Sequence, residues 1–324
     1  MPDPIHTIVD VIPVPDGAAF FEVFGDSIYC AHPRMSQVDV ATKTVRRLGD
    51  GIVGCIAVVD FHRPIDAVPD IIGAGQPDRR IYVALEDGSI GEYSPPLLHA
   101  FRQFRSWPSS DVPFIGRIVG AHSAKYLYFH DWNTYTIGIM DIDRPDPRTL
   151  GSIQLENVAW DMVVSPDDRF IYASHWFQNL LSVVDTSRFP PSVQTHRIPN
   201  GPTGLALSAD GKRLFVAQCG DSGGDPSDLG TGTLSVLDTS TMQGSWLYTG
   251  DWATSVVVNA AGTRAYVSNS HAHTVSAVDV TGDPAVIDTI SGFTDPATMR
   301  FSVDERRLYV AEQGGSPRLA VAAI

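Results

Sequence analysis

Short apolar runs alternate with polar residues along most of the chain, and turn-forming residues separate one run from the next. A representative stretch has an apolar run at 161–164, an Asp-Asp turn, a second run at 170–173 and a third at 181–186. Alternation over four to eight residues between tight turns is typical of consecutive antiparallel strands. The pattern therefore predicts an all-β chain in which neighbouring strands pair as a meander.

The meander repeats. Segments 165–172, 208–215 and 302–309 share a small residue, an acidic turn, a basic residue and an apolar strand, and 259–266 is a looser copy. The aromatic residue of the second strand recurs about every 43 to 53 residues, which is the period of a four-stranded propeller blade. Seven positions carry this marker: Tyr29, Tyr82, Tyr128, Tyr172, Phe215, Tyr266 and Tyr309.

The two ends of the chain complete the repeat. The sequence stops too soon after Tyr309 for a fourth strand, whereas 6–13 resembles the fourth strands at 194–199 and 287–291. Joining the ends removes two sheet edges that would otherwise favour aggregation. We therefore expect one domain over 1–324, a seven-bladed β-propeller whose last blade is completed by the N-terminal strand.

The strand ends also resemble a known family. Tyr266-Val267-Ser268-Asn269, with Tyr82-Val83-Ala84 and Tyr309-Val310-Ala311, is similar to the YVTN-type propeller repeat. Lactonase-type propellers, including phosphogluconolactonase-like proteins, share this kind of blade. The resemblance implies the fold, and it makes ring-opening of a lactone one version of an enzymatic function; members of the group also include surface and scaffold proteins.

Composition narrows the classes of partner. The formal net charge is −14 and no cluster of Lys and Arg occurs, so we expect no nucleic-acid partner. The three cysteines Cys30, Cys55 and Cys219 lack metal-type spacing, and free thiols are expected. A basic stretch followed by an apolar one is absent from the N-terminus, and no apolar run reaches membrane-spanning length, so we expect a cytoplasmic protein without membrane contact.

Candidate chemistry lies where the loops of all blades converge on the channel. Three residues past each marker, the chain has mostly groups that donate, accept or carry protons, and two tryptophans and an amide follow them. The register positions are His32, Leu85, Asp131, His175, Gln218, Asn269 and Glu312, and the following residues are Trp132, Trp176 and Gln313.

The leading hypothesis from these residues is a small-molecule enzyme without an organic cofactor, a hydrolase, lyase or isomerase. Imidazoles beside carboxylates can run acid-base chemistry near neutral pH. The expected catalytic residues are His175 as first acid or base, Glu312 as the second, Asp131 as orienter, and His32. Trp132, Trp176, Gln218, Asn269 and Gln313 are expected to bind substrate. A metal held by His32, His175 and a carboxylate is an alternative use.

Other interpretations stay open. Polar residues at strand ends also serve to hydrogen-bond loops. His271 and His273 can chelate a metal, and the acidic loop 221–230 can bind a cation or cover the channel. The insertion 61–79 can cover a face of the ring. Cys219 can act as a thiolate nucleophile or be a small buried residue. The second functional hypothesis is a non-catalytic binding module that presents its loops to a protein or ligand.

Overall fold

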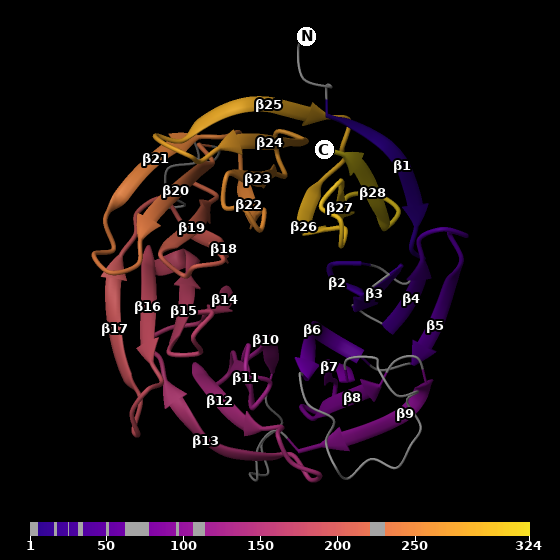
Figure 1. The fold of residues 1–324 in the computed structure, drawn as a ribbon, viewed down its shortest axis with the longest axis vertical. Coiled ribbons are helices and arrows are strands. Elements are labelled where there is room, and N and C mark those ends of the chain that lie inside the picture. Colours follow the sequence, from indigo (N-terminus) through magenta and orange to yellow (C-terminus); the bar gives the residue numbers. More distant parts are fainter. Residues whose placement is uncertain are drawn as a thin grey trace.

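Seven four-stranded antiparallel sheets stand around a central axis (Figure 1). The structure is a computed structural model that describes residues 6–15, 18–24, 26–31, 35–49, 52–61, 78–94, 97–105, 114–220 and 231–324. The predicted all-β, seven-bladed propeller is confirmed. No helix in the described ranges is both long and apolar enough to cross a membrane.

Each blade is a meander that begins next to the axis and ends at the rim (Figure 1). Blade 1 has β2 (Phe20–Phe24), β3 (Ser27–Ala31), β4 (Met35–Asp39) and β5 (Val45–Gly49). Blade 2 has β6 (Ile52–Phe61), β7 (Asp78–Leu85), β8 (Ile90–Ser94) and β9 (Leu97–Phe104). Blade 3 has β10 (Ile115–Gly120), β11 (Tyr126–Asp131), β12 (Thr136–Asp141) and β13 (Arg148–Gln154).

The remaining blades follow the same order. Blade 4 has β14 (Asp161–Val164), β15 (Phe170–His175), β16 (Leu180–Asp185) and β17 (Ser192–Arg197), with the 3-10 helix η1 (Trp176–Gln178) after β15. Blade 5 has β18 (Pro202–Leu207), β19 (Arg213–Gln218), β20 (Thr233–Asp238) and β21 (Gly244–Tyr248). Blade 6 has β22 (Ala253–Val258), β23 (Arg264–Asn269), β24 (Thr274–Asp279) and β25 (Ala285–Ser291). Blade 7 has β26 (Pro296–Phe301), β27 (Arg307–Glu312), β28 (Arg318–Ala323) and β1 (Thr7–Pro13).

The second strand of a blade is its most buried part. In β11, β15, β19 and β23 the five residues after the first are all buried, because both faces of the strand pack against neighbouring blades. The aromatic markers lie in these strands, as predicted, and Tyr128 and Tyr172 are each only 2% exposed. Outer strands such as β13 instead alternate between exposed and less exposed residues, as expected at the rim.

The repeated turn has a local physical cause. The Ser165 hydroxyl donates to Asp167 at 2.5 Å and accepts from the Phe170 backbone N–H at 2.8 Å. The same two bonds recur at Ser208 and Ser302. A residue with positive φ follows in each copy, Asp168 at 58° and Gly211 at 69° among them, so Gly and Asp are favoured there. Hydrogen-bonding needs of the turn thus explain the sequence repeat.

The N-terminal strand closes the ring as predicted. β1 pairs antiparallel with β28, from Thr7 opposite Ala323 to Pro13 opposite Arg318. In Figure 1 the indigo β1 runs along the outer side of the yellow β28. Ile12 is fully buried in a cluster that joins blade 7 to blade 1 and includes Phe21.

The three cysteines are buried and free, which confirms the expectation of free thiols. Burial raises the pKa of Cys30 to about 12, and that of Cys55 to about 12 as well. These two thiols are therefore neutral and unreactive at physiological pH.

Candidate functional site at the channel mouth

The predicted polar positions share one place in the fold. Asp131, His175, Gln218, Asn269 and Glu312 each end the second strand of their blade, and each is at most 3% exposed. Their side chains are buried within their own blades. Three further predicted features lie outside the described residues: His32, the loop 221–230 and residues 62–77 of the insertion.

His175 uses both ring nitrogens inside blade 4. Nδ1 lies 2.9 Å from the carbonyl oxygen of Val158, and Nε2 lies 2.8 Å from the Ser182 hydroxyl. Because a carbonyl can only accept, Nδ1 carries the proton and Nε2 accepts from Ser182. Burial lowers the pKa of His175, so the ring is neutral at pH 7. His175 ties the loop that enters blade 4 to the third strand.

The two carboxylates hold loops in the same way. Asp131 accepts hydrogen bonds from the backbone N–H of Phe114 at 3.1 Å and from the Thr134 hydroxyl at 2.8 Å. Glu312 accepts from the Thr294 backbone N–H and pairs with the Arg318 guanidinium. Each carboxylate therefore has fixed partners within its blade.

The two amides complete the set. Gln218 donates to the Pro199 carbonyl at 2.6 Å and accepts from Ser235 at 2.6 Å. Asn269 donates to the Thr249 carbonyl at 3.2 Å. In five blades, then, the residue that ends the second strand fastens the loop arriving from the preceding blade.

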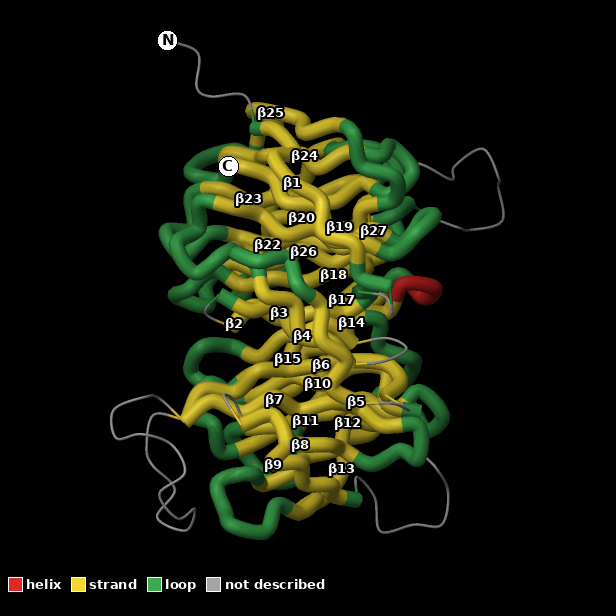
Figure 2. The backbone as a smooth tube through the Cα atoms, turned by 90° about the vertical axis from the view of Figure 1, so that its right-hand side faces the viewer, coloured by secondary structure: helices red, strands yellow, loops and turns green. Residues whose placement is uncertain are grey.

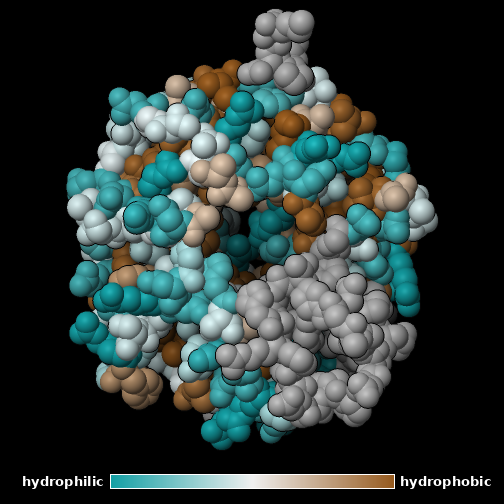
Figure 3. Space-filling model, in the orientation of Figure 1, coloured by the Kyte–Doolittle hydropathy of each residue, from teal (hydrophilic) through white to brown (hydrophobic). Residues whose placement is uncertain are grey.

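A cavity of about 650 Å³ lies in the channel among the inner strands. The central opening of the ring is visible in the space-filling view (Figure 3). Of the predicted residues, Trp132, Trp176 and Gln313 line this cavity, whereas the five buried strand-end residues do not. Trp160, Trp252, His271 and Asp295, which the sequence prediction did not place in the substrate site, line it as well.

Six aromatic side chains form one continuous arc, which we call the aromatic arc: Phe114, Trp132, Trp160, Trp176, Phe177 and Trp252. Ring centroids are 5.9 Å apart between Trp132 and Trp160, 5.0 Å between Trp160 and Trp176, and 5.6 Å between Trp176 and Trp252. Trp160 is 39% exposed, and Phe114 and Phe177 are exposed too. Figure 2 shows η1, which carries Trp176 and Phe177, projecting from one face of the ring. We call this end of the channel the mouth.

A repeated backbone hydrogen bond places the mouth residues. The residue after the second strand donates its N–H to the carbonyl of the residue just before the inner strand. This bond brings Trp132 beside Phe114 at 2.9 Å and Gln313 beside Asp295 at 3.0 Å. It likewise joins Ser270 to Trp252 at 2.9 Å.

Glycines make room for two of the indoles. A Cβ on Gly116 would lie 1.9 Å from Nε1 of Trp132, and one on Gly201 would lie 2.8 Å from Cδ1 of Trp176. Trp176 thus lies against the backbone of blade 5 and reaches Trp252 of blade 6. Glycine is required at both positions for this close approach.

Charged side chains on the inner strands pair with one another. Arg117 lies 2.8 Å from Asp161, and Arg300 lies 2.7 Å from Glu22. Asp161 also accepts the backbone N–H of Leu205 at 2.9 Å. These ion pairs cross between blades, so they join neighbouring blades around the channel; Arg117, Asp161 and Arg300 also line the cavity.

Asp295 differs from these carboxylates. Its side chain takes part in no hydrogen bond or ion pair with the described residues, and it is only partly exposed. Burial raises its pKa, an effect that nearby His271 and His273 oppose and Glu312 reinforces. His271 in turn stacks on Trp252, with ring centroids 4.5 Å apart. No group of three His, Cys, Asp or Glu suited to a metal ion occurs in the described part of the chain.

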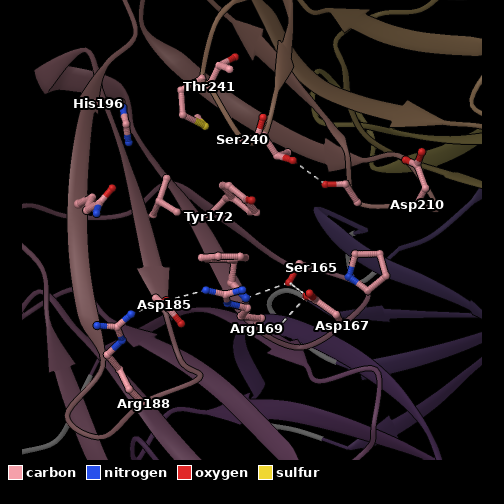
Figure 4. A pocket seen from close by; sticks show the side chains of 17 residues that line it. Ser165, Asp167, Arg169, Tyr172, Asp185, Arg188, His196, Asp210, Ser240 and Thr241 are labelled. Atoms are coloured by element: carbon pink, nitrogen blue, oxygen red, sulfur yellow. Dashed lines mark hydrogen bonds and ion pairs between the residues drawn. The ribbon is translucent and has the colours of Figure 1, made fainter.

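A second cavity, of about 770 Å³, lies between blades 4 and 5 (Figure 4). Its charged groups already have partners: Asp185 lies 3.5 Å from Arg169 and 3.6 Å from Arg188. Asp167 and Asp210 belong to the repeated turns. The second cavity is therefore lined by groups that maintain the fold, and the mouth is the better candidate site.

No protein-family model and no curated protein sequence matches the chain. Solved structures do match. A chain of the structure titled "Crystal Structure of Mitotic Checkpoint Complex" has 12% identity and a TM-score of 0.76, covering 98% of this chain and 92% of that one. Hydrazine synthase of Kuenenia stuttgartiensis has 14% identity and a TM-score of 0.71, covering 95% and 96%.

The β-propeller domain of Cps50 (Swd1) from Myceliophteria thermophila has 12% identity and a TM-score of 0.71, covering 98% of this chain and 99% of that chain. Identities this low give no support to the lactonase resemblance beyond the architecture. What the chain shares with these proteins is the seven-bladed β-propeller fold.

Proposed function

We propose that the chain is a non-catalytic recognition module that binds a segment of a protein partner at the channel mouth. The observation that carries this proposal is the aromatic arc, a row of partly exposed rings beside a cavity of about 650 Å³. Contiguous exposed apolar surface on a propeller marks an interaction site. Aromatic side chains are also the residues that most often dominate binding energy at interfaces.

The buried strand-end residues favour this function over the small-molecule enzyme. A general acid or base must come within hydrogen-bond reach of its substrate. His175 and Glu312 do not line the cavity, and their polar atoms are engaged inside the blades. The lactonase-like hypothesis would need these bonds to break and the side chains to turn outward.

The similar structures include a component of a protein assembly and, by its name, an enzyme, so the architecture is compatible with a recognition role without requiring one. One of them is a chain of a mitotic checkpoint complex, which is by its title an assembly of proteins. A rigid ring holds its loops in fixed relative positions, so binding there costs little conformational entropy.

A selected peptide library tests the proposal. Peptides are selected on the wild-type protein, and their affinities are then measured by fluorescence polarisation for Trp160→Ser and Trp252→Ser. We expect losses of about tenfold or more, the size typical of an aromatic residue that dominates an interface. Trp246→Ser is the matched control, because Trp246 is 70% exposed but lies on the outer strand β21.

Unchanged affinity in both mouth variants would overturn the proposal. So would a loss confined to Trp246→Ser, since that result would move the binding surface to the rim of blade 5. Melting temperatures of all three variants show that each remains folded.

A further inference from the structure

We propose that the mouth recognises an organic cation, a guanidinium or alkylammonium group carried by the partner, between the aromatic arc and the Asp295 carboxylate. This inference rests on the proposed function and names the chemistry of the group that enters the cavity. It follows from the unpaired Asp295 carboxylate in the cavity, from the tryptophan faces that line the cavity and from the negative net charge of the whole chain.

Among the described residues, the charged side chains that line the cavity have ion-pair partners except for one carboxylate. Arg117 is paired with Asp161, and Arg300 with Glu22, so each guanidinium has its own carboxylate. Asp295 also lines the cavity, and its carboxylate has no hydrogen-bond or ion-pair partner among the described residues. An entering cation would meet an unpaired carboxylate, whereas an entering anion would have to compete with an existing ion pair.

Partial burial makes this carboxylate a strong partner. Burial raises the pKa of Asp295, so its charge is held at a cost to the unliganded protein. A cation placed beside it offsets that cost, and the interaction is stronger than it would be in open solvent. His271 and His273 oppose part of the rise in the pKa of Asp295, but neither forms an ion pair with its carboxylate.

The aromatic lining suits the apolar part of such a cation. The face of an indole attracts a cation within about 6 Å of its centroid, and tryptophan does so best. Trp176 and Trp252 both line the cavity, with ring centroids 5.6 Å apart and planes at 85°, so they form a corner rather than a flat wall. His271, stacked on Trp252, connects this corner to Asp295.

The charge of the whole chain acts in the same direction. A formal net charge of −14 attracts cations and repels anions before contact. A neutral apolar ligand would use the indoles but would gain nothing from Asp295 or from this field. The cavity therefore matches an organic cation better than an anion or a neutral group.

Matched pairs of small probes test the inference. Tryptophan fluorescence is titrated with N-acetylarginine amide and its neutral analogue N-acetylcitrulline amide, and with choline and its neutral analogue 3,3-dimethylbutan-1-ol. We expect the cations to bind wild type with dissociation constants on the order of millimolar, at least about tenfold more tightly than their neutral partners. Added salt should weaken the binding of the cationic probes and leave the binding of the neutral probes unchanged.

Two substitutions locate the effect. Asp295→Asn should remove the preference for the cation over its neutral analogue. Trp252→Leu should weaken binding of the cation severalfold. Asp251→Asn is the matched control and should behave as wild type, because exposed Asp251 is next to Trp252 in the chain but does not line the cavity and is bonded to Tyr248. Melting temperatures again report folding.

Equal binding of charged and neutral probes would overturn the inference, as would a cation preference that survives in Asp295→Asn. If the selected peptides still lose affinity in Trp252→Ser, the recognition module stands and only its ligand chemistry is wrong. If neither the probes nor the peptides respond to the mouth variants, both proposals fail.

Discussion

The ionisation of Asp295 affects the stability of the folded protein. A carboxyl whose pKa is higher in the folded than in the unfolded protein favours folding when protonated and opposes it when ionised. Burial raises the pKa of Asp295 above its ordinary 3.8, with His271 and His273 opposing part of the effect. The contribution of Asp295 to stability is thus most favourable below about pH 3.8 and falls as the pH rises through its folded pKa.

Asp295→Asn should therefore raise the melting temperature at pH 7, because it removes a partly buried charge while keeping a polar side chain of the same size. The advantage over wild type should shrink as the pH is lowered toward 3.8, because a carboxyl with a raised pKa is more than half protonated there. Calorimetric melts of both proteins from pH 3.5 to 7.5 provide the measurement. A variant less stable than wild type at pH 7 would show that the carboxylate has a stabilising partner after all.

At the scale of the strand and loop, the buried polar residue that ends the second strand of blades 3–7 holds the incoming loop by hydrogen bonds. His175 bonds the Val158 carbonyl and the Ser182 hydroxyl, and Gln218 and Asn269 make equivalent bonds one and two blades further on. These side chains decide where the loops of the mouth lie. Under the proposed function, they would influence binding through the position of the loops and not through contact with the ligand.

His175→Phe should accordingly destabilise the protein without abolishing peptide binding. The substitution leaves the buried Ser182 hydroxyl and the carbonyl of half-buried Val158 without this partner, and an unsatisfied buried group costs roughly 1–3 kcal/mol. Urea unfolding measures the change, and peptide affinity is measured well below the unfolding midpoint. His196→Phe, on the outer strand β17, serves as the control. Lost binding or turnover at unchanged stability would instead support the acid-base function first inferred from the sequence.

The same elements show what the sequence could and could not predict. The turns at Ser165, Ser208 and Ser302 repeat because each is hydrogen-bonded locally, so the blade period and the shared register of the strand-end residues were readable. The direction of each side chain could not be predicted from the sequence. It alternates along a strand, and the packing of neighbouring blades decides which side chains reach the cavity. Trp132 and Trp176 therefore face the cavity while Asp131 and His175, one residue earlier, are buried.

The mouth residues before the inner strands were harder to find. They occupy one structural position, but they are Phe114, Gly201, Trp252 and Asp295 in four of the blades, so no residue type repeats. Register shifts between the first and second strands, as at Ile115/Arg117, further change the sequence spacing between the residue before the inner strand and the end of the second strand. Only the repeated backbone hydrogen bond, which the structure supplies, aligns them.

At the scale of the whole molecule, the ring depends on contacts between the two chain ends. β1 supplies the outer strand of blade 7, and His6, just before it, pairs with Asp288 of blade 6 at 2.8 Å. Ile12 lies between blades 7 and 1 and is fully buried. Every position at the mouth is defined relative to this closed ring, so loss of closure would affect stability and recognition together.

Ile12→Ala tests how much of that stability comes from the closing strand. Truncating a fully buried isoleucine costs about 2–5 kcal/mol, through lost burial and the cavity left behind. Val9→Ala in the same strand is the control; because Val9 is 55% exposed, its cost should stay within about 0.5 kcal/mol.

Deleting residues 1–13 should go further, leaving the edge of β28 unpaired and causing concentration-dependent association visible by light scattering. A monomeric deletion variant that melts like wild type would mean that the remaining blades hold the ring closed without β1.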